Sequence, residues 1–218
     1  MQVDYSETHW KILDQKRKIA IEILRMLMSK GMEGYVYGSV ARGDVNDKSD
    51  VDIVVFNPNY IILDTLEVHH KYIIQATPNS VPKAYLSLDE NEEVVISFPL
   101  GKLRRNELEF YSFGGLIDLK GLEEKKRVIG VNKNLMIIIP TENGHMELPL
   151  NGNEDYAAKL LKISVDTIRE REKLLTKRAD KGHTGIYLRY DLDGNESIYD
   201  AFAKIYKSNK YFRRMINA

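Results

Sequence analysis

Two aspartates, Asp50 and Asp52, stand two positions apart at the start of an apolar segment of the chain. Because alternate residues of a β-strand project to the same face, the two carboxylates converge if this segment is a strand. Neighbouring carboxylates repel each other unless a cation lies between them, and hard oxygen ligands of this kind suit Mg²⁺ or Mn²⁺. The pair therefore predicts a divalent metal site.

Gly38 and Ser39 lie shortly before the two aspartates, where an apolar segment ends. A residue without a side chain lets phosphate oxygens reach backbone N–H groups, and the serine hydroxyl offers one more hydrogen bond. We therefore expect these residues to hold the phosphate tail of a ligand. Arg42 either pairs with the same phosphates or braces the loop against Asp44 or Asp47, and the sequence favours neither interpretation.

The whole stretch GSVARGDVNDKSDVDIVV, residues 38–55, resembles the active-site motif of the DNA polymerase β-like nucleotidyltransferase superfamily, in the form predicted for archaea and bacteria. The resemblance implies an α+β protein with a nucleotidyltransferase fold, a mixed β-sheet flanked by helices. It also implies an NTP such as ATP as donor and Mg²⁺ ions that clamp the attacking hydroxyl and the leaving pyrophosphate. The residues it assigns are Gly38, Ser39, Arg42 and Ser49 for nucleotide binding, and Asp50 and Asp52 for catalysis and metal binding.

The superfamily generally adds a third carboxylate on a neighbouring strand. The expected strand here, EVVISF, has the apolar Val95 at its centre. Glu93 lies two residues earlier and shares that face, so it is our predicted third catalytic residue, with Asp89 and Asp118 as alternatives. Loss of this carboxylate would weaken metal binding and activation of the acceptor hydroxyl. The second hypothesis is therefore a DNA-binding regulator with a catalytically weak or inactive nucleotide-binding domain.

The apolar pattern predicts the elements that position these residues, and they make up a nucleotidyltransferase domain over residues 1–150. Helical spacing and alternating polarity are the two signals used. The predicted elements are a helix from Ser6 to about Lys30, strands at 35–37 and 51–56, a helix at 60–72, and hairpins at 83–98 and 135–150.

Residues 151–218 are predicted to form a second, small domain. Residues 154–172, EDYAAKLLKISVDTIRERE, resemble a helix-turn-helix in which Ser164 caps the second helix. The following GIYLRYDL and DGNE suggest a hairpin, so that the module resembles a winged helix. Its predicted nucleic-acid-binding residues are Thr167, Arg169, Arg171 and Lys173. The alternative is a helical domain for packing or dimerisation, with charges that are merely solvated.

The charge distribution gives weak support to a DNA or RNA partner. Residues 151–218 hold 14 Lys and Arg against 10 Asp and Glu, and residues 1–150 hold 18 against 22, within a net charge of zero. An acidic metal-binding half and a basic nucleic-acid-binding half would produce this asymmetry. A difference of this size also arises from composition alone.

Composition excludes several classes of protein. The chain has no cysteine, so disulfides, thiolate zinc sites and a cysteine nucleophile are excluded. Hydrophobic residues make up 43% and charged residues 29%, as in soluble globular proteins. The start is unlike a signal peptide, and no apolar segment approaches the roughly 20 residues that span a bilayer. We expect a cytoplasmic protein without a membrane partner, whose acceptor and oligomeric state the sequence does not indicate.

Overall fold

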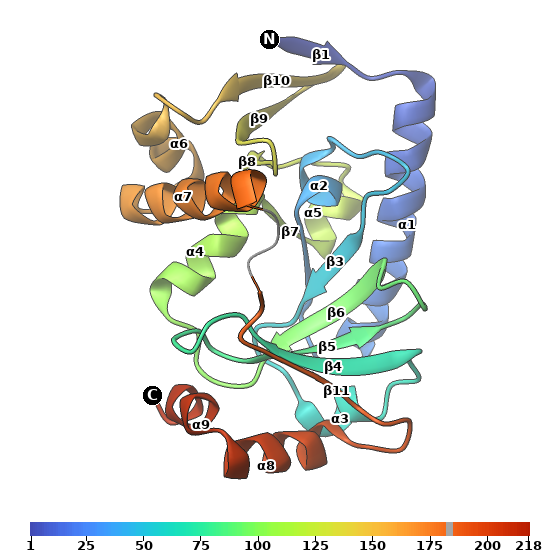
Figure 1. Cartoon of the computed structure of the whole chain (residues 1–218). Coiled ribbons are helices and arrows are strands. Elements are labelled where there is room, and N and C mark those ends of the chain that lie inside the picture. The colour runs from blue at the N-terminus through green and yellow to red at the C-terminus, as the bar shows by residue number, and fades with distance from the viewer. Residues whose placement is uncertain (182–184) are drawn as a thin grey trace. The chain divides into compact units, whose positions relative to one another are not determined.

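Figure 1 shows a computed structural model of the chain, which describes residues 1–181 and 185–218. Contacts within the chain define two compact units. Unit 1 comprises Met1–Arg25, Tyr35–Val51 and Arg105–Thr184, and unit 2 comprises Met26–Gly34, Asp52–Arg104 and Gly185–Ala218. These units interleave along the sequence, whereas the predicted domains 1–150 and 151–218 are consecutive. The two divisions describe different things, and the predicted domain boundary stays a prediction.

Unit 1 combines an antiparallel sheet with several helices. The sheet has the strand order β1-β10-β9-β8, and a separate antiparallel pairing joins β2 to β7. The hairpin predicted at 135–150 is confirmed as β9 and β10. The elements are β1 (Gln2–Asp4), most of α1 (Glu7–Ser29), β2 (Tyr35–Tyr37), α2 (Ser39–Arg42), α4 (Arg105–Gly114), β7 (Leu116–Asp118), α5 (Leu119–Glu123), β8 (Gly130–Val131), β9 (Met136–Thr141), β10 (Gly144–Pro149), α6 (Glu154–Leu161) and α7 (Val165–Lys181).

The predicted first helix is confirmed as α1. Its buried positions include Leu13, Ala20 and Leu24, which recur at the spacing of one helix face. Arg17 lies on the same face and is only 7% exposed. Because a buried cation must be hydrogen-bonded or paired, this position requires partners inside the protein for the guanidinium.

The first two helices after residue 150, α6 and α7, share a core with the segment before them. Ala157 of α6 and Ile168 of α7 are buried in the same cluster as Phe113 of α4 and Ile137 of β9. Figure 1 shows α6, α7 and α4 close to β8 and β9. The predicted helix pair is therefore present, and it packs on α4 and the sheet of unit 1.

Unit 2 is built around strands in the order β11-β4-β5-β6-β3. The pairings β11–β4, β4–β5 and β5–β6 are antiparallel, and the hairpin predicted at 83–98 is confirmed as β5 and β6. Since helices and strands are mixed in both units, the predicted α+β class is confirmed. The elements of unit 2 are nearly all of β3 (Val51–Val54), α3 (Tyr60–Asp64), β4 (His70–Gln75), β5 (Lys83–Ser87), β6 (Val94–Pro99), β11 (Leu188–Asp191), α8 (Ile198–Ser208) and α9 (Lys210–Ile216).

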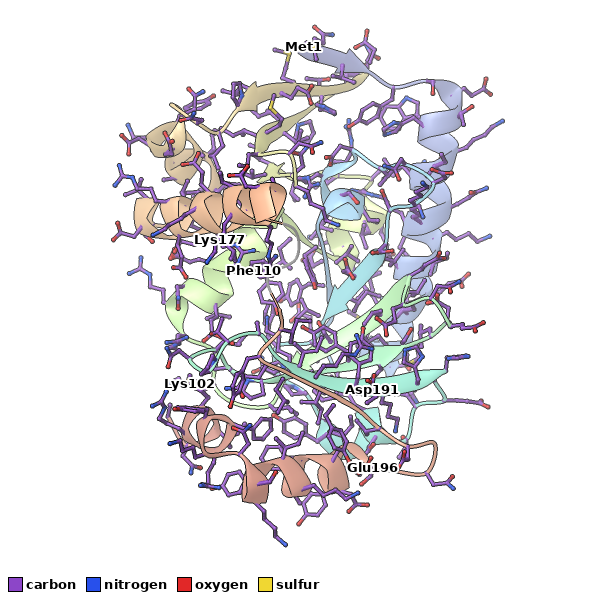
Figure 2. All side chains as sticks on the ribbon, viewed as in Figure 1. Met1, Lys102, Phe110, Lys177, Asp191 and Glu196 are labelled. Atoms are coloured by element: carbon purple, nitrogen blue, oxygen red, sulfur yellow. The ribbon has the colours of Figure 1, made fainter. Side chains whose placement is uncertain are left out.

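Two predictions in unit 2 are wrong. The helix expected at 60–72 ends with α3 at Asp64, and β4 takes up the β-branched and aromatic residues that follow. The hairpin expected as a wing does not form, because β11 pairs with β4 and the turn after it leads into α8. Figure 2 marks Asp191 at the end of β11 and Glu196 just before α8. The described residues therefore show no wing beside α6 and α7.

The C-terminal segment forms two short helices, α8 and α9. Ser197 and Asn209 cap α8 and α9 through their side chains. A pocket of about 250 Å³ lies between α3 and α8, lined mostly by aromatic and aliphatic side chains, and none of the predicted site residues lines it. No helix among the described residues is long and apolar enough to cross a membrane.

Candidate functional site

Gly38 forms the turn between β2 and α2, at the position predicted to face phosphate. Its φ of 91° and ψ of −149° lie in a region that glycine alone occupies without strain. Its N–H donates to the carbonyl of Gly115 at 3.0 Å. Ser39 begins α2, which has only four residues. The predicted Gly-Ser turn is therefore held by the backbone after α4.

Arg17 holds this turn through hydrogen bonds to backbone carbonyls, a role that the spacing of the motif did not reveal. Its guanidinium donates to the carbonyl oxygens of Val40 at 3.0 Å, Ala41 at 2.9 Å and Lys126 at 2.5 Å. Burial, with the charge of Arg127 as a smaller contribution, lowers the pKa of Arg17 to about 10. The sequence did contain a signal for this role, because an arginine lies on the apolar face of the predicted first helix. A cation at a buried position must be hydrogen-bonded to other groups of the protein.

Arg42 is engaged within the loop. Its Nε and Nη2 atoms donate to the two carboxylate oxygens of Asp44 at 2.8 and 3.1 Å, and its Nη1 donates to the carbonyl of Gly114 at 2.7 Å. The side chain is only 6% exposed. Of the two interpretations that the sequence left open, these contacts favour the bracing role with Asp44 as partner.

The loop that leads to Asp50 is held by Lys16 and Ser49. The ammonium of Lys16 donates to the carbonyl of Ser49 at 2.6 Å, and the hydroxyl of Ser49 accepts from the N–H of Asn46 at 2.9 Å. Ser49 thus shapes the loop in addition to its predicted role in nucleotide binding. Asp50 follows as an exposed residue directly before β3.

Asp52 is the second residue of β3 and belongs to unit 2. Burial and then the negative charge of Asp52 raise the pKa of Tyr85, on β5, to about 12. The Tyr85 ring stacks on Tyr72 of β4 with centroids 5.0 Å apart, and the guanidinium of Arg189 lies 4.1 Å from the Tyr72 centroid. Asp52 therefore lies on a polar, aromatic face of the sheet in unit 2.

The third carboxylate is the weakest part of the predicted site. Val95 is only 6% exposed, and Glu93 is an exposed residue just before β6. Asp89 accepts backbone N–H groups of its own turn, and Asp118 caps α5. Within residues 1–181 and 185–218, no three His, Asp or Glu side chains form a group that could hold a metal ion. Glu93 as the third catalytic residue stays a prediction.

The four predicted nucleic-acid-binding residues of α7 divide between two faces of the helix. Thr167 is 3% exposed, and its hydroxyl donates to Glu109 of α4 at 2.9 Å. Arg171 stacks on Phe110 of α4, with the guanidinium carbon 4.4 Å from the ring centroid. Arg169 and Lys173 are exposed. Only the last two of the four predicted residues lie on the exposed side of the helix.

Glu109, which motif spacing did not reveal, fills the N-terminus of α7. Its carboxylate accepts hydrogen bonds from the N–H and the hydroxyl of Ser164, and Ser164 in turn caps the N–H of Thr167 as predicted. The carboxylate of Glu109 therefore already occupies the anion-binding position at the N-terminus of α7, where a phosphate would otherwise bind. The helix pair is confirmed, while its identity as a DNA-binding helix-turn-helix stays a prediction.

Comparison with known proteins gives one result. Residues 16–109 match the family model described as nucleotidyltransferase domain, which spans α1 from Lys16 through β3, β6 and the first half of α4. No curated protein and no solved structure gives a significant match. The matched segment includes all the predicted nucleotide and metal residues, and it supports a nucleotidyl-transfer activity in general.

Proposed function

We propose that this protein transfers a nucleoside monophosphate from an NTP to an acceptor hydroxyl, with Mg²⁺ or Mn²⁺. In this reaction the acceptor oxygen attacks the α-phosphorus, the bond to the bridging oxygen breaks, and pyrophosphate leaves. The observation that carries the proposal is the Gly38 turn, whose glycine-only conformation opens the backbone to phosphate within a segment that matches the nucleotidyltransferase domain.

Each residue of the motif has a role in this proposal. Gly38 and Ser39 bind the phosphate tail, and Arg17 and Arg42 hold their turn in place through the carbonyls described above. Asp50 and Asp52 would hold the metal ion. Mg²⁺ in proteins commonly takes one or two carboxylates together with substrate phosphates and water, so this donor set fits. When bound, the ion would neutralise charge on the phosphates and polarise the reacting oxygens.

The second candidate function is a regulator that binds a nucleotide without efficient transfer. The apolar Val95 favours it, because it occupies the place where the superfamily resemblance implies a carboxylate. Asp50 and Asp52 oppose it, since a domain that only senses a nucleotide does not require both.

Nucleic acid is the acceptor or partner that we propose for the basic side of α7. Arg169 and Lys173 are exposed on that helix and provide positive charge for a phosphate backbone. In the helix-turn-helix interpretation, α7 would be the helix that contacts DNA or RNA. The Glu109 contact at its N-terminus restricts that contact to the exposed side of the helix.

The test is incubation with Mg²⁺ and each NTP labelled on the α-phosphate, with and without DNA or RNA. The informative variants are Asp50→Asn and Asp52→Asn, which remove charge but keep shape. Asp47→Asn is the matched control, because Asp47 is an exposed aspartate in the same loop. Transfer of label by the wild type and the control, but not by the other two variants, supports the enzyme.

The regulator predicts a different result from the same experiment. It would bind NTP in calorimetry while transferring no label to any acceptor. Restoring the carboxylate with Val95→Asp then separates the two candidates further. A gain of label transfer in that variant would show that the wild type is inactive because it lacks this carboxylate.

A further inference from the structure

Arg171 of α7 carries a hydrogen-bond donor without a visible acceptor. Its Nε atom is buried and has no partner among the residues that the structure describes. Burial, followed by the charge of Arg178, lowers the pKa of Arg171 to about 10, and the nearby Glu170 offsets only part of this effect. Buried donors are almost always paired, so an unpaired one points to a missing acceptor.

The side chain of Arg171 is directed toward α4 and away from the exposed side of α7. Thr167 lies one helical turn before it and therefore on the same face. The hydroxyl of Thr167 donates to Glu109 of α4, and the guanidinium of Arg171 covers the ring of Phe110, the next residue of α4. Figure 2 labels Phe110 below α7. The two contacts fix the orientation of Arg171.

Aromatic contacts link this position to the Gly-Ser turn within unit 1. The ring of Phe110 lies edge-on to the ring of Tyr37, with centroids 6.2 Å apart, and the Tyr111 ring lies 5.0 Å from Tyr37. Tyr37 is the last residue of β2 and directly precedes Gly38. The platform under Arg171 is therefore packed against the strand that ends in the phosphate-binding turn.

The backbone of α4 makes the same link. Gly114 follows Phe110 by four residues, which is one helical turn or about 6 Å along the axis. The Gly115 carbonyl next to it accepts the N–H of Gly38. The helix whose Phe110 lies under the guanidinium of Arg171 therefore ends beside the backbone that holds the phosphate-binding turn.

We propose that Arg171 binds the triphosphate of the nucleotide held at Gly38 and Ser39, an inference that rests on the function proposed above. A triphosphate brings several charged acceptor oxygens, and the guanidinium presents its donors in a planar fork suited to phosphate. Stacking on Phe110 holds that fork in one plane. The same cation could serve the backbone phosphates of a nucleic acid, and the experiment distinguishes these two sources of phosphate.

The experiment compares the wild type with Arg171→Gln, which removes the charge and keeps a side chain of similar shape. Lys177→Gln is the matched control, because it removes an exposed positive charge on the same helix that has no proposed part in binding. Each protein is titrated by calorimetry with ATP, with inorganic tripolyphosphate and with a single-stranded oligonucleotide. We expect Arg171→Gln to weaken binding of ATP and tripolyphosphate by about tenfold or more, as for loss of a charge-assisted hydrogen bond, and the control to leave both unchanged.

A thermal measurement separates binding from folding. Tripolyphosphate should raise the unfolding temperature of the wild type and of Lys177→Gln, and should raise that of Arg171→Gln much less, while the ligand-free temperatures stay close. Arg171→Lys keeps the charge without the planar fork, so it should lose affinity by a smaller factor. If Arg171→Gln does not fold, the comparison of Arg171→Lys with the wild type decides.

Three outcomes would overturn the inference. One is equal ATP and tripolyphosphate affinity for the wild type and the Arg171 variants. Another is loss of oligonucleotide binding alone, which would assign Arg171 to a nucleic-acid backbone; in both cases label transfer that depends on Asp50 and Asp52 would leave the proposed function standing. A wild type that binds no NTP would overturn the inference and the proposed function together.

Discussion

Glu109 of α4 accepts hydrogen bonds from both the N–H and the hydroxyl of Ser164, at 2.8 and 3.1 Å, and so occupies the N-terminus of α7. A carboxylate at this end of a helix satisfies free N–H groups and is stabilised by the helix dipole. The contact also holds α7 against α4, the helix in which the matched segment ends and after which Gly115 binds the Gly38 turn. It thereby sets which face of α7 remains exposed.

Replacing Glu109 with Gln should lower the free energy of unfolding by about 1–3 kcal/mol, because hydrogen bonds to a charged acceptor are lost. Urea denaturation measures this change. Glu170→Gln, an exposed glutamate on α7, is the control and should stay within about 0.5 kcal/mol of the wild type. A Glu109→Gln protein as stable as its control would mean that the carboxylate contributes nothing to docking.

The same residue predicts a pH dependence. Partial burial acts against ionisation, but the hydrogen bonds from Ser164 and Thr167 outweigh it and hold the pKa of Glu109 below its ordinary value of 4.5. Because the folded pKa is the lower one, this stabilisation is present above pH 4.5 and is lost as pH falls through the folded pKa. The stability difference between wild type and Glu109→Gln should therefore shrink on acidification below pH 4.5, as urea denaturation at several pH values would show.

Gly38→Ala should destabilise the protein and abolish nucleotide binding. No neighbouring atom would obstruct the added Cβ, so the effect comes from the backbone conformation alone, at about 1–3 kcal/mol. Gly194→Ala is the control, because that glycine has equal space and no left-handed φ. Urea denaturation and ATP calorimetry measure the two effects. A Gly38→Ala protein that binds ATP normally would contradict the role of this turn.

Arg42 and Asp44 should behave as one unit in a double-mutant cycle. Removing either partner leaves the other charge buried and unpaired, so Arg42→Met and Asp44→Asn should each cost about 3–5 kcal/mol. The double variant should cost clearly less than the sum, since no unpaired charge remains. Additive costs in urea denaturation would instead indicate that Arg42 acts on a partner other than Asp44.

Tyr85 should report on the charge of Asp52. Burial is the larger cause of its pKa of about 12, and Asp52 adds to it, so Asp52→Asn should lower this pKa while Asp47→Asn should not. The folded pKa of Tyr85 lies above its ordinary value of 10.0, so folding favours the neutral hydroxyl. The contribution of this group to the free energy of unfolding is therefore fully present below pH 10 and is lost as the pH rises toward 12. NMR titration of labelled tyrosine gives the values, and an unchanged Tyr85 in Asp52→Asn would contradict the proximity of the two groups.

The sequence predicted those elements whose pattern is local. The first helix, the strand pair around the motif and the hairpins at 83–98 and 135–150 each follow from periodicity and turn residues within one short segment. Residues 60–72 misled this approach, because a run rich in β-branched residues after a helical start suits either structure. Pairing with β5 selected the strand for His70–Gln75, and no residue inside the segment encodes that partner.

The sequence by itself determined the types and order of the chemical groups: the glycine of the turn, the serine beside it and the two aspartates, because these depend on spacing along one stretch of chain. The tertiary structure alone decided which arginine side chains are already bound to groups of the protein and which remain available to a ligand. Arg17 donates to backbone carbonyls, and Arg42 binds a carbonyl and Asp44. Arg171 is directed toward α4, although the sequence alone does not distinguish it from the exposed Arg169 two residues earlier. The physical reason is that a charged side chain takes its role from the groups that surround it after folding, and those come from distant parts of the sequence.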